Sequence, residues 1–419
     1  MRPKRNNGSK KELSAGEQKI LDTIQQDIIG RYFEPAIGTG GFEILSTLRY
    51  DPSFTHLFPE QHHQHHSQSQ NDQEAAKLNE IDTRLQTMDY NDNNLFALPE
   101  ETDSGKFEEY IGGINDSSST TGDISLMSLM NECMGTQGSS PPETTLTGST
   151  PSEEELYPIF YQRFLLLGEH FKRLNLSLEF FKWGFQVPID LLLENLIRAI
   201  PDYHEVEDIR EKMRLLIEVR NCYKMRVLIY DSGKMRVEAH PIPLPPPPAS
   251  PTDFTLSTTH YFISNILGGF IPNIPSNWDV FVDTEPTKIS PFTTFKTTYR
   301  QPYSAARQRM TQLAEKYGTN KKCEILVYND TFQLMEGSIS SVAVIRYKED
   351  DPTQFRFITP PLASGCLCGT MRRYLLKKGL IDEHPIDVRD LCDGEQVILL
   401  NGVMGCVKGT IRQSYQKPT

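Results

Sequence analysis

The sequence reads FKTTYRQPY at residues 295–303 and LMEGSISSVAVI at residues 334–345. In the first stretch Lys296 follows Phe295 at the junction between a predicted strand and a predicted helix. In the second stretch Glu336 stands inside a strand pattern. Each residue alone has an ordinary interpretation, because the lysine could be solvated and an edge strand would leave the carboxylate in water. A carboxylate buried within the sheet would need a partner.

The segments around these two stretches alternate between the strand and helix periods. Strands are predicted at 278–284, 323–330 and 332–349, and two short strands around a glycine bend at 395–411. Helices are predicted at 303–317 and 369–378. This half of the chain is therefore predicted to be an ordered α+β or α/β domain.

The first half contains a second set of elements. A short helix is predicted at 13–29, a strand at 42–50, helices at 157–185, 188–200 and 206–220, and a hairpin at 222–243. Asp231-Ser232-Gly233 is a favourable turn between the two hairpin strands. The run PLPPPPASP that follows, residues 243–251, is typical of a stiff extended linker and marks a domain boundary.

Composition divides the chain further. Residues 1–12 are predicted to be a disordered basic tail, and 13–242 a smaller N-terminal α/β domain. That domain carries an insertion at about 51–155, rich in Ser, Thr, Asn, Gln and Asp, which is too polar to offset its ordering entropy. Its four-histidine cluster is read as low complexity rather than as a metal site. Residues 252–419 form the predicted larger domain, and we expect removal of the insertion to leave the fold intact.

Charge and cysteine content exclude several classes of protein. The 419 residues contain 43 Lys and Arg against 55 Asp and Glu, a formal charge of −12, which argues against a dedicated nucleic-acid binder. No apolar run reaches the length of a membrane helix or a signal peptide. The seven cysteines form no CxxC pair. We therefore expect a reduced cytoplasmic protein that binds neither membrane nor nucleic acid and holds no metal.

Six segments taken together resemble the fold-type IV pyridoxal-phosphate enzymes, a family of two-domain proteins that includes branched-chain and D-amino-acid aminotransferases. They are FEILSTLRYDP, EHFKRLNLS, FKTTYRQPY, LMEGSISSVAVI, TPPLASGCLCGTMRRYLL and LLNGVMGCVKGTI. Together with CYKMRVLI, this combination is most similar to the fungal aminodeoxychorismate lyases of that family. The resemblance covers about 42–50, 156–245 and 253–411, and it implies the cofactor pyridoxal 5′-phosphate.

The resemblance also implies roles for particular residues. Lys296 matches the lysine that binds the cofactor aldehyde and later acts as general acid and base. Glu336 matches the carboxylate facing the pyridine nitrogen, and Arg173 the guanidinium that clamps the phosphate. Tyr303 matches a tyrosine near the ring. Thr370 and Met371, after Gly369, match a helix N-terminus that donates N–H groups to the phosphate. Asn401 and Gly402 match a second phosphate-facing loop.

Candidates for holding the substrate carboxylates follow by family position. Arg49 and Arg226 are the candidate cations, and each has the alternative of being a surface arginine at a strand edge. Thr47 shares the face of Arg49 by the period of two and is a further candidate. Two departures from the family pattern, Met371 after Thr370 and Ser341 in place of Asn, favour a lyase over a transaminase.

The resemblance implies an aminodeoxychorismate lyase, which releases pyruvate from 4-amino-4-deoxychorismate and leaves 4-aminobenzoate for folate synthesis. It also implies a homodimer. Two alternatives remain open from the sequence. One is an aminotransferase for branched-chain or D-amino acids, which would convert the cofactor to its amine form with an amino-acid donor. The other is a non-catalytic interaction protein, for which substitution of Lys296 would be neutral.

Overall fold

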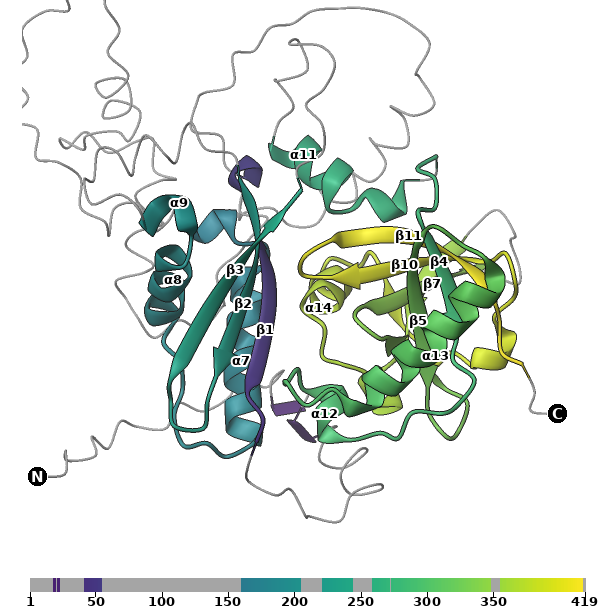
Figure 1. The fold of residues 1–419 in the computed structure, drawn as a ribbon, viewed down its shortest axis with the longest axis horizontal. Coiled ribbons are helices and arrows are strands. Elements are labelled where there is room, and N and C mark those ends of the chain that lie inside the picture. The colour runs from purple at the N-terminus through teal and green to yellow at the C-terminus, as the bar shows by residue number, and fades with distance from the viewer. Residues whose placement is uncertain are drawn as a thin grey trace, which may run out of the picture.

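The computed structural model describes residues 18–19, 21–22, 41–54, 160–204, 221–243, 258–271, 273–347 and 355–416. Within these ranges it contains two β-sheets with helices packed against them (Figure 1). Several predictions fall outside the described residues: the basic tail, most of the helix at 13–29, the insertion beyond residue 54, the helix at 206–220 and the proline-rich linker.

The smaller sheet has three antiparallel strands in the order β1-β2-β3. Its strands are β1 (Ile44–Tyr50), β2 (Cys222–Ile229) and β3 (Met235–Ile242). The predicted hairpin is confirmed, and Gly233 turns it with a φ of 82°, in the left-handed region that glycine adopts most readily. β1 is an edge strand of this sheet, which leaves its other side available to the rest of the molecule.

Helices cover one face of the smaller sheet, namely α7 (Leu167–Phe180), α8 (Ile189–Arg198) and α9 (Pro201–His204). The prediction of one continuous helix over 157–185 was wrong. Phe164 forms a β-bridge with Tyr50, and Leu166 adopts a left-handed φ of 53° before α7 begins. The backbone leaves the helix here because it hydrogen-bonds to β1, with the Leu165 N–H donating to the Arg49 carbonyl at 2.8 Å.

The larger sheet has eight strands in the order β6-β5-β4-β11-β10-β7-β8-β9. Their bounds are β4 (Trp278–Val282), β5 (Lys322–Tyr328), β6 (Leu334–Gly337), β7 (Ser341–Tyr347), β8 (Phe355–Thr359), β9 (Asp382–Glu383), β10 (Gln396–Asn401) and β11 (Gly405–Gln413). The β4, β5, β6, β7, β10 and β11 strands were predicted. β8 and the two-residue β9 were not predicted.

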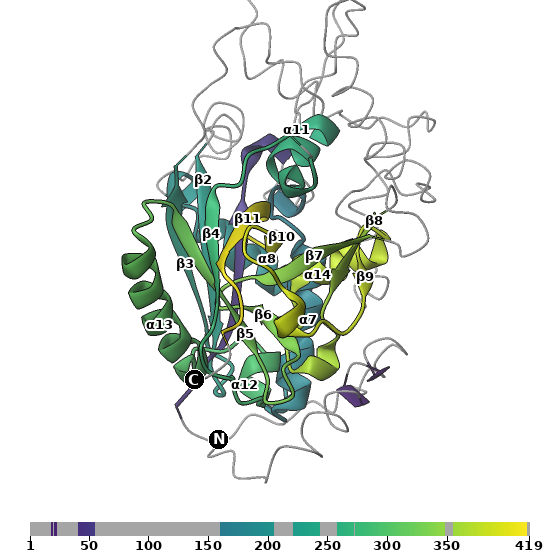
Figure 2. The ribbon, with the colours of Figure 1, turned by 90° about the vertical axis from the view of Figure 1, so that its right-hand side faces the viewer.

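Further helices and 3-10 turns complete the described residues. They are α11 (Thr258–Asn265), α12 (Pro291–Thr294), α13 (Gln301–Tyr317) and α14 (Thr370–Lys377), with 3-10 turns η2 (Pro52–Phe54), η4 (Gly268–Phe270), η5 (Leu362–Ser364) and η6 (Val388–Asp390). α13 packs against β5, and α14 packs against β10. In Figure 2, α13 lies at the left of the view and α14 to the right of β4, β11 and β10. α11, which was not predicted, has Thr258 and Thr259 at its start, both weak helix formers.

The two sheets meet along β1. The Leu45 N–H donates to the Lys296 carbonyl at 2.9 Å, the Thr298 N–H to the Glu43 carbonyl at 2.9 Å, and the Arg49 N–H to the Gly402 carbonyl at 3.0 Å. One apolar core cluster runs from Leu48 under α7 to Leu400 of β10. The edge of the small sheet is therefore fixed against the loops that carry the candidate site residues.

The described residues lack both a membrane-spanning helix and a metal-binding cluster. None of their helices combines the length and apolar composition needed to cross a bilayer. Within the same ranges, no three His, Cys, Asp or Glu side chains converge in a way that could hold a metal ion.

Candidate active site

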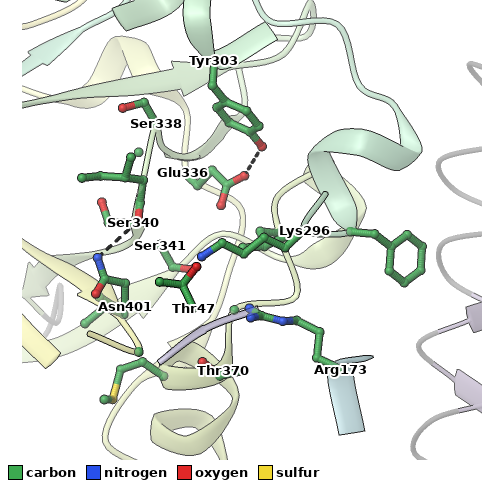
Figure 3. A pocket seen from close by; sticks show the side chains of 18 of the residues that line it. Thr47, Arg173, Lys296, Tyr303, Glu336, Ser338, Ser340, Ser341, Thr370 and Asn401 are labelled. Carbon is green, nitrogen blue, oxygen red and sulfur yellow. Dashed lines mark hydrogen bonds between the residues drawn. The ribbon is translucent and has the colours of Figure 1, made fainter. Parts of the chain in front are cut away.

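A cavity lies between β1 and the loops of the larger sheet, and it gathers most of the residues that the sequence singled out (Figure 3). Ten of these residues line it: Thr47, Arg173, Lys296, Tyr303, Glu336, Gly369, Thr370, Met371, Asn401 and Gly402. They come from strands and helices more than 350 residues apart in the chain. The cavity has a cationic region at Arg173, an amine at Lys296 and a carboxylate at Glu336.

Lys296 is positioned by the segment before it. α12 begins with a capping box in which the Ser290 N–H donates to Thr293 Oγ1 at 3.2 Å, and the chain becomes extended again at Phe295. The Lys296 side chain points into the cavity (Figure 3). Burial and the nearby cations Arg173 and Arg300 lower the pKa of Lys296 well below its usual value. An amine with a lowered pKa is a nucleophile near neutral pH, which suits attack on an aldehyde.

Glu336 lies on β6 with only 3% of its surface exposed. Tyr303 Oη donates to Glu336 Oε1 at 2.5 Å. Burial raises the pKa of Glu336 to about 8, while the Tyr303 hydroxyl, the Leu367 N–H and Arg300 act in the opposite direction. The carboxylate would therefore gain a proton near neutral pH unless a cation faced it. Burial and the adjacent carboxylate raise the pKa of Tyr303, which stays a neutral hydrogen-bond donor.

The opposite end of the cavity is built to receive an anion. Arg173 projects from α7, is 3% exposed, and forms no ion pair with any carboxylate in the described ranges. Burial lowers its pKa to about 10, so it remains charged at neutral pH. α14 begins beside it with Gly369 as its N-cap and no side-chain cap. The first N–H groups of a helix lack partners within the helix and favour negative charge.

The loop after β10 closes this end. A Cβ added to Gly402 would lie 2.6 Å from His170 Nε2, so only glycine fits at this close approach. Asn401 holds the loop, because its Oδ1 accepts from the Val403 and Met404 N–H groups at 2.9 and 2.8 Å. Asn401 therefore shapes the backbone at the cavity wall, as a turn residue does.

The structure places Arg49 and Arg226 outside the residues that line the cavity. Arg49 forms an ion pair with the buried Asp51 at 2.5 Å. Arg226 forms one with Glu238 at 2.7 Å, across the β2–β3 register. Arg226 is also the register partner of Thr47, so both side chains are on the same face of the small sheet.

Several residues at the site were not predicted from the sequence. Arg300 lines the cavity, places its guanidinium 4.8 Å from the centroid of the Tyr303 ring, and donates to the Ser338 carbonyl. It is the last residue of FKTTYR, four positions after Lys296, and that motif was the available signal. His170 and Ser46 lie directly behind Arg173.

Glu324 of β5 was also missed, and it supports the turn between β6 and β7. It is fully buried and accepts from the Ser338 N–H and Oγ at 3.0 and 2.6 Å, from the Ile339 N–H at 3.2 Å and from Ser340 Oγ at 2.8 Å. Residues 337–341 line the cavity. The buried carboxylate therefore holds one wall of the site from beneath.

We expect Glu324→Gln to destabilise the protein by on the order of 3 kcal/mol. The substitution places an NH₂ group among hydrogen-bond donors, which leaves several of them buried and unsatisfied. The midpoint of urea unfolding measures the effect, and the exposed Glu315→Gln on α13 is the matched control. Equal midpoints for the two variants would contradict the structural role given to Glu324.

The cavity holds a buried amine of lowered pKa, a buried carboxylate and a guanidinium that forms no ion pair in the described ranges. These groups suit an anionic cofactor that carries an aldehyde and a basic ring nitrogen. The sequence matches the model of the amino-transferase class IV family over residues 155–410, more than half of the chain. The chain belongs to this family, which depends on pyridoxal phosphate.

The chain is similar to several known proteins. Over 275 residues the chain is 43% identical to the aminodeoxychorismate lyase of Saccharomyces cerevisiae, a match covering 62% of this chain and 71% of that protein. Among solved structures, the branched-chain amino acid aminotransferase of Escherichia coli is 15% identical, over 59% and 70% of the two chains, with a TM-score of 0.37. A pyridoxal-phosphate-bound hypothetical aminotransferase of Mycobacterium tuberculosis is also 15% identical, over 61% and 79%, with a TM-score of 0.38. The family assignment rests on the family model and the yeast relative.

Proposed function

We propose that this protein is an aminodeoxychorismate lyase, which converts 4-amino-4-deoxychorismate to 4-aminobenzoate and pyruvate for folate synthesis. The observation that carries the proposal is the convergence of Lys296, Glu336 and Arg173 on one cavity, in a chain 43% identical to the yeast lyase. The aminotransferase remains the second candidate because the same three residues would serve it.

The cavity suits pyridoxal phosphate, and each of its ends has a donor set that matches one part of that molecule. Arg173 and the N-terminus of α14 would hold the phosphate, with Thr370, Met371, Asn401 and Gly402 around it. Lys296 would bind the aldehyde carbon. Glu336, which burial disposes to take a proton, would face the protonated ring nitrogen, and Tyr303 would orient it.

When bound, the cofactor supplies an electron-withdrawing ring that stabilises negative charge on the carbon bearing the substrate amino group. Lys296 then acts as the base that removes the proton from this carbon. The electron pair left behind forms a ring double bond as the C–O bond of the adjacent enolpyruvyl ether breaks. The released enolate takes a proton and becomes pyruvate, and the substrate ring becomes aromatic. Glu336 keeps its negative charge throughout and holds the ring nitrogen protonated.

Arg49 and Arg226 were both expected to hold the substrate carboxylates, but their different partners predict different effects of substitution. We expect Arg226→Gln to raise KM for the substrate about tenfold with little change in kcat, because Arg226 shares a face with Thr47 of the cavity wall. We expect Arg49→Gln to act on stability instead, because it would leave the buried Asp51 unpaired. Steady-state kinetics and urea unfolding of both variants measure these effects, and the reverse assignment of KM and stability would contradict this distinction.

The direct test of the function is pyruvate release from aminodeoxychorismate, followed with a coupled lactate dehydrogenase assay. Incubation with branched-chain or D-amino acids in the absence of a keto acid tests the second candidate. A lyase releases pyruvate and keeps the cofactor's absorbance spectrum under these conditions. An aminotransferase changes the spectrum to that of the amine form and releases no pyruvate from aminodeoxychorismate.

The same proposal includes a homodimer in the cytoplasm, as expected for an enzyme of this family. Light scattering of the purified full-length chain tests the oligomeric state. Two units, 13–242 and 252–419 joined by the linker at 243–251, are proposed as its domains. The separate sheets of the described residues support this division.

A further inference from the structure

His170 lies behind the anion-binding end of the cavity and makes contacts through both ring nitrogens. Its Nδ1 is 2.7 Å from Ser46 Oγ of β1, and its Nε2 is 3.3 Å from Thr370 Oγ1 at the first residue of α14. The ring is 1% exposed and packs against Gly402, where no side chain would fit. It therefore joins three segments that are distant in sequence.

The direction of these hydrogen bonds follows from counting hydrogens. Arg173 Nη2 donates to Ser46 Oγ at 3.2 Å, and a guanidinium can only donate. The Ser46 oxygen accepts this bond, so its own hydrogen must go elsewhere. Ser46 is fully buried, and the acceptor that its hydroxyl meets among the described residues is His170 Nδ1. Because buried hydroxyl hydrogens are rarely left unbonded, Nδ1 is the acceptor and carries no hydrogen.

A neutral imidazole with an unprotonated Nδ1 has its hydrogen on Nε2. That hydrogen points at Thr370 Oγ1, which accepts it. The Thr370 hydroxyl hydrogen is then free to turn into the cavity, which Thr370 lines. Burial and the charges of Arg173 and Lys296 lower the pKa of His170 well below its usual value, in agreement with a neutral ring.

We propose that His170 is the positioning residue of the phosphate site: its Nδ1 fixes Arg173 through Ser46, and its Nε2–H directs the Thr370 hydroxyl toward the cavity as a donor. One buried ring thereby positions two groups that would contact a phosphate. The Arg173 guanidinium can only donate, and the ring leaves the Thr370 hydroxyl hydrogen free to donate as well. A dianionic phosphate can only accept hydrogen bonds, so this arrangement favours it over any group that donates. The inference rests on the proposed use of pyridoxal phosphate.

The test compares the cofactor with pyridoxal, which lacks the phosphate. Apoenzymes of wild type and His170→Phe are titrated with each compound, and dissociation constants are measured by fluorescence quenching. We expect the variant to bind pyridoxal phosphate about tenfold more weakly and pyridoxal within twofold of wild type. His384→Phe, at an exposed position, is the matched control and should change neither constant. Equal weakening of both compounds would show a general structural role and overturn the proposal.

Two further measurements address the hydrogen-bond chain itself. Ser46→Ala breaks the same chain, so the double variant with His170→Phe should bind pyridoxal phosphate no more than twofold more weakly than His170→Phe alone. In two-bond ¹H–¹⁵N spectra of wild-type protein, His170 should carry its hydrogen on Nε2 from pH 6 to 8. Additive effects of the two substitutions, or a hydrogen on Nδ1, would contradict the proposed direction.

The outcomes also separate this inference from the function on which it rests. A wild-type protein that bound no pyridoxal phosphate would contradict the proposed function. A wild type that bound the cofactor and released pyruvate, with an unchanged preference for the phosphate in His170→Phe, would contradict only the role of His170.

Discussion

Replacing Lys296 with Ala is expected to lower pyruvate release by about 10⁴-fold, because the proposed mechanism gives this amine both the covalent attachment of the cofactor and the proton transfer. The cavity contains no second amine among the residues that line it in the described ranges. The substitution leaves the proposed phosphate contacts of Arg173 and α14 unchanged. We therefore expect the variant to keep a folded structure and to bind pyridoxal phosphate reversibly.

The attachment itself can be observed directly. Wild type should show a visible absorbance band that borohydride removes, and digestion should then yield the cofactor on a peptide containing Lys296. Lys288→Ala, at an exposed position near the same segment, is the matched control and should leave both activity and labelling unchanged. Labelling of Lys288 or Lys224 instead would contradict the assignment of Lys296, and a neutral Lys296→Ala would favour a non-catalytic protein.

Much of the larger sheet could be predicted from sequence because its strands have strong local signals. The buried runs at β4, β5 and β10 are apolar segments bounded by clear breaks. The break before α7 could not be predicted in this way. Phe164 and Leu167 fit a helical period, and only the edge of β1, more than a hundred residues away, draws the backbone out of the helix.

The candidate site likewise contains residues with local sequence signals and residues whose roles depend on tertiary contacts. Lys296 and Glu336 stand in recognisable motifs, and the structure brings them to one cavity. His170 and Glu324 instead act through partners that no local pattern reveals, since His170 contacts residues 124 and 200 positions away. Arg226 forms an ion pair with Glu238, whose position depends on the register of the β2–β3 hairpin. Residue type predicts what a side chain can bind, and tertiary contacts decide which partners it meets.

Glu336→Gln is expected to lower kcat by about 10²- to 10³-fold while the affinity for pyridoxal phosphate changes only a few-fold. The amide keeps the shape of the side chain and can still accept from Tyr303 Oη, but it cannot hold the ring nitrogen protonated. The loss therefore falls on charge that develops during the reaction. Near-normal turnover in Glu336→Gln would show that this carboxylate does not set the electronics of the ring.

Tyr303→Phe is the matched variant, because it keeps the charge of Glu336 and removes its hydroxyl donor. Since that hydroxyl lowers the pKa of Glu336, its loss should raise this pKa further. We expect the activity of Tyr303→Phe to fall at neutral pH and to recover partly as the pH is raised, whereas the activity of Glu336→Gln stays low at every pH. A profile of kcat/KM from pH 6 to 9 for both variants measures this difference.

The stability of the apoenzyme gives an independent check on Glu336. Its pKa is about 8 in the folded protein against an ordinary value of 4.5, so the folded state binds this proton more tightly than the unfolded state. The contribution of Glu336 to folding is thus most favourable below pH 4.5 and is lost as the pH rises toward 8. Glu336→Gln has no such proton, so its stability relative to wild type should increase between pH 5 and pH 8. Urea unfolding of the two apoenzymes at several pH values measures this difference. If the difference in stability between the two apoenzymes stayed constant with pH, a cation of the protein would already balance the Glu336 carboxylate. That outcome would contradict the proposal that this carboxylate pairs with a protonated cofactor ring.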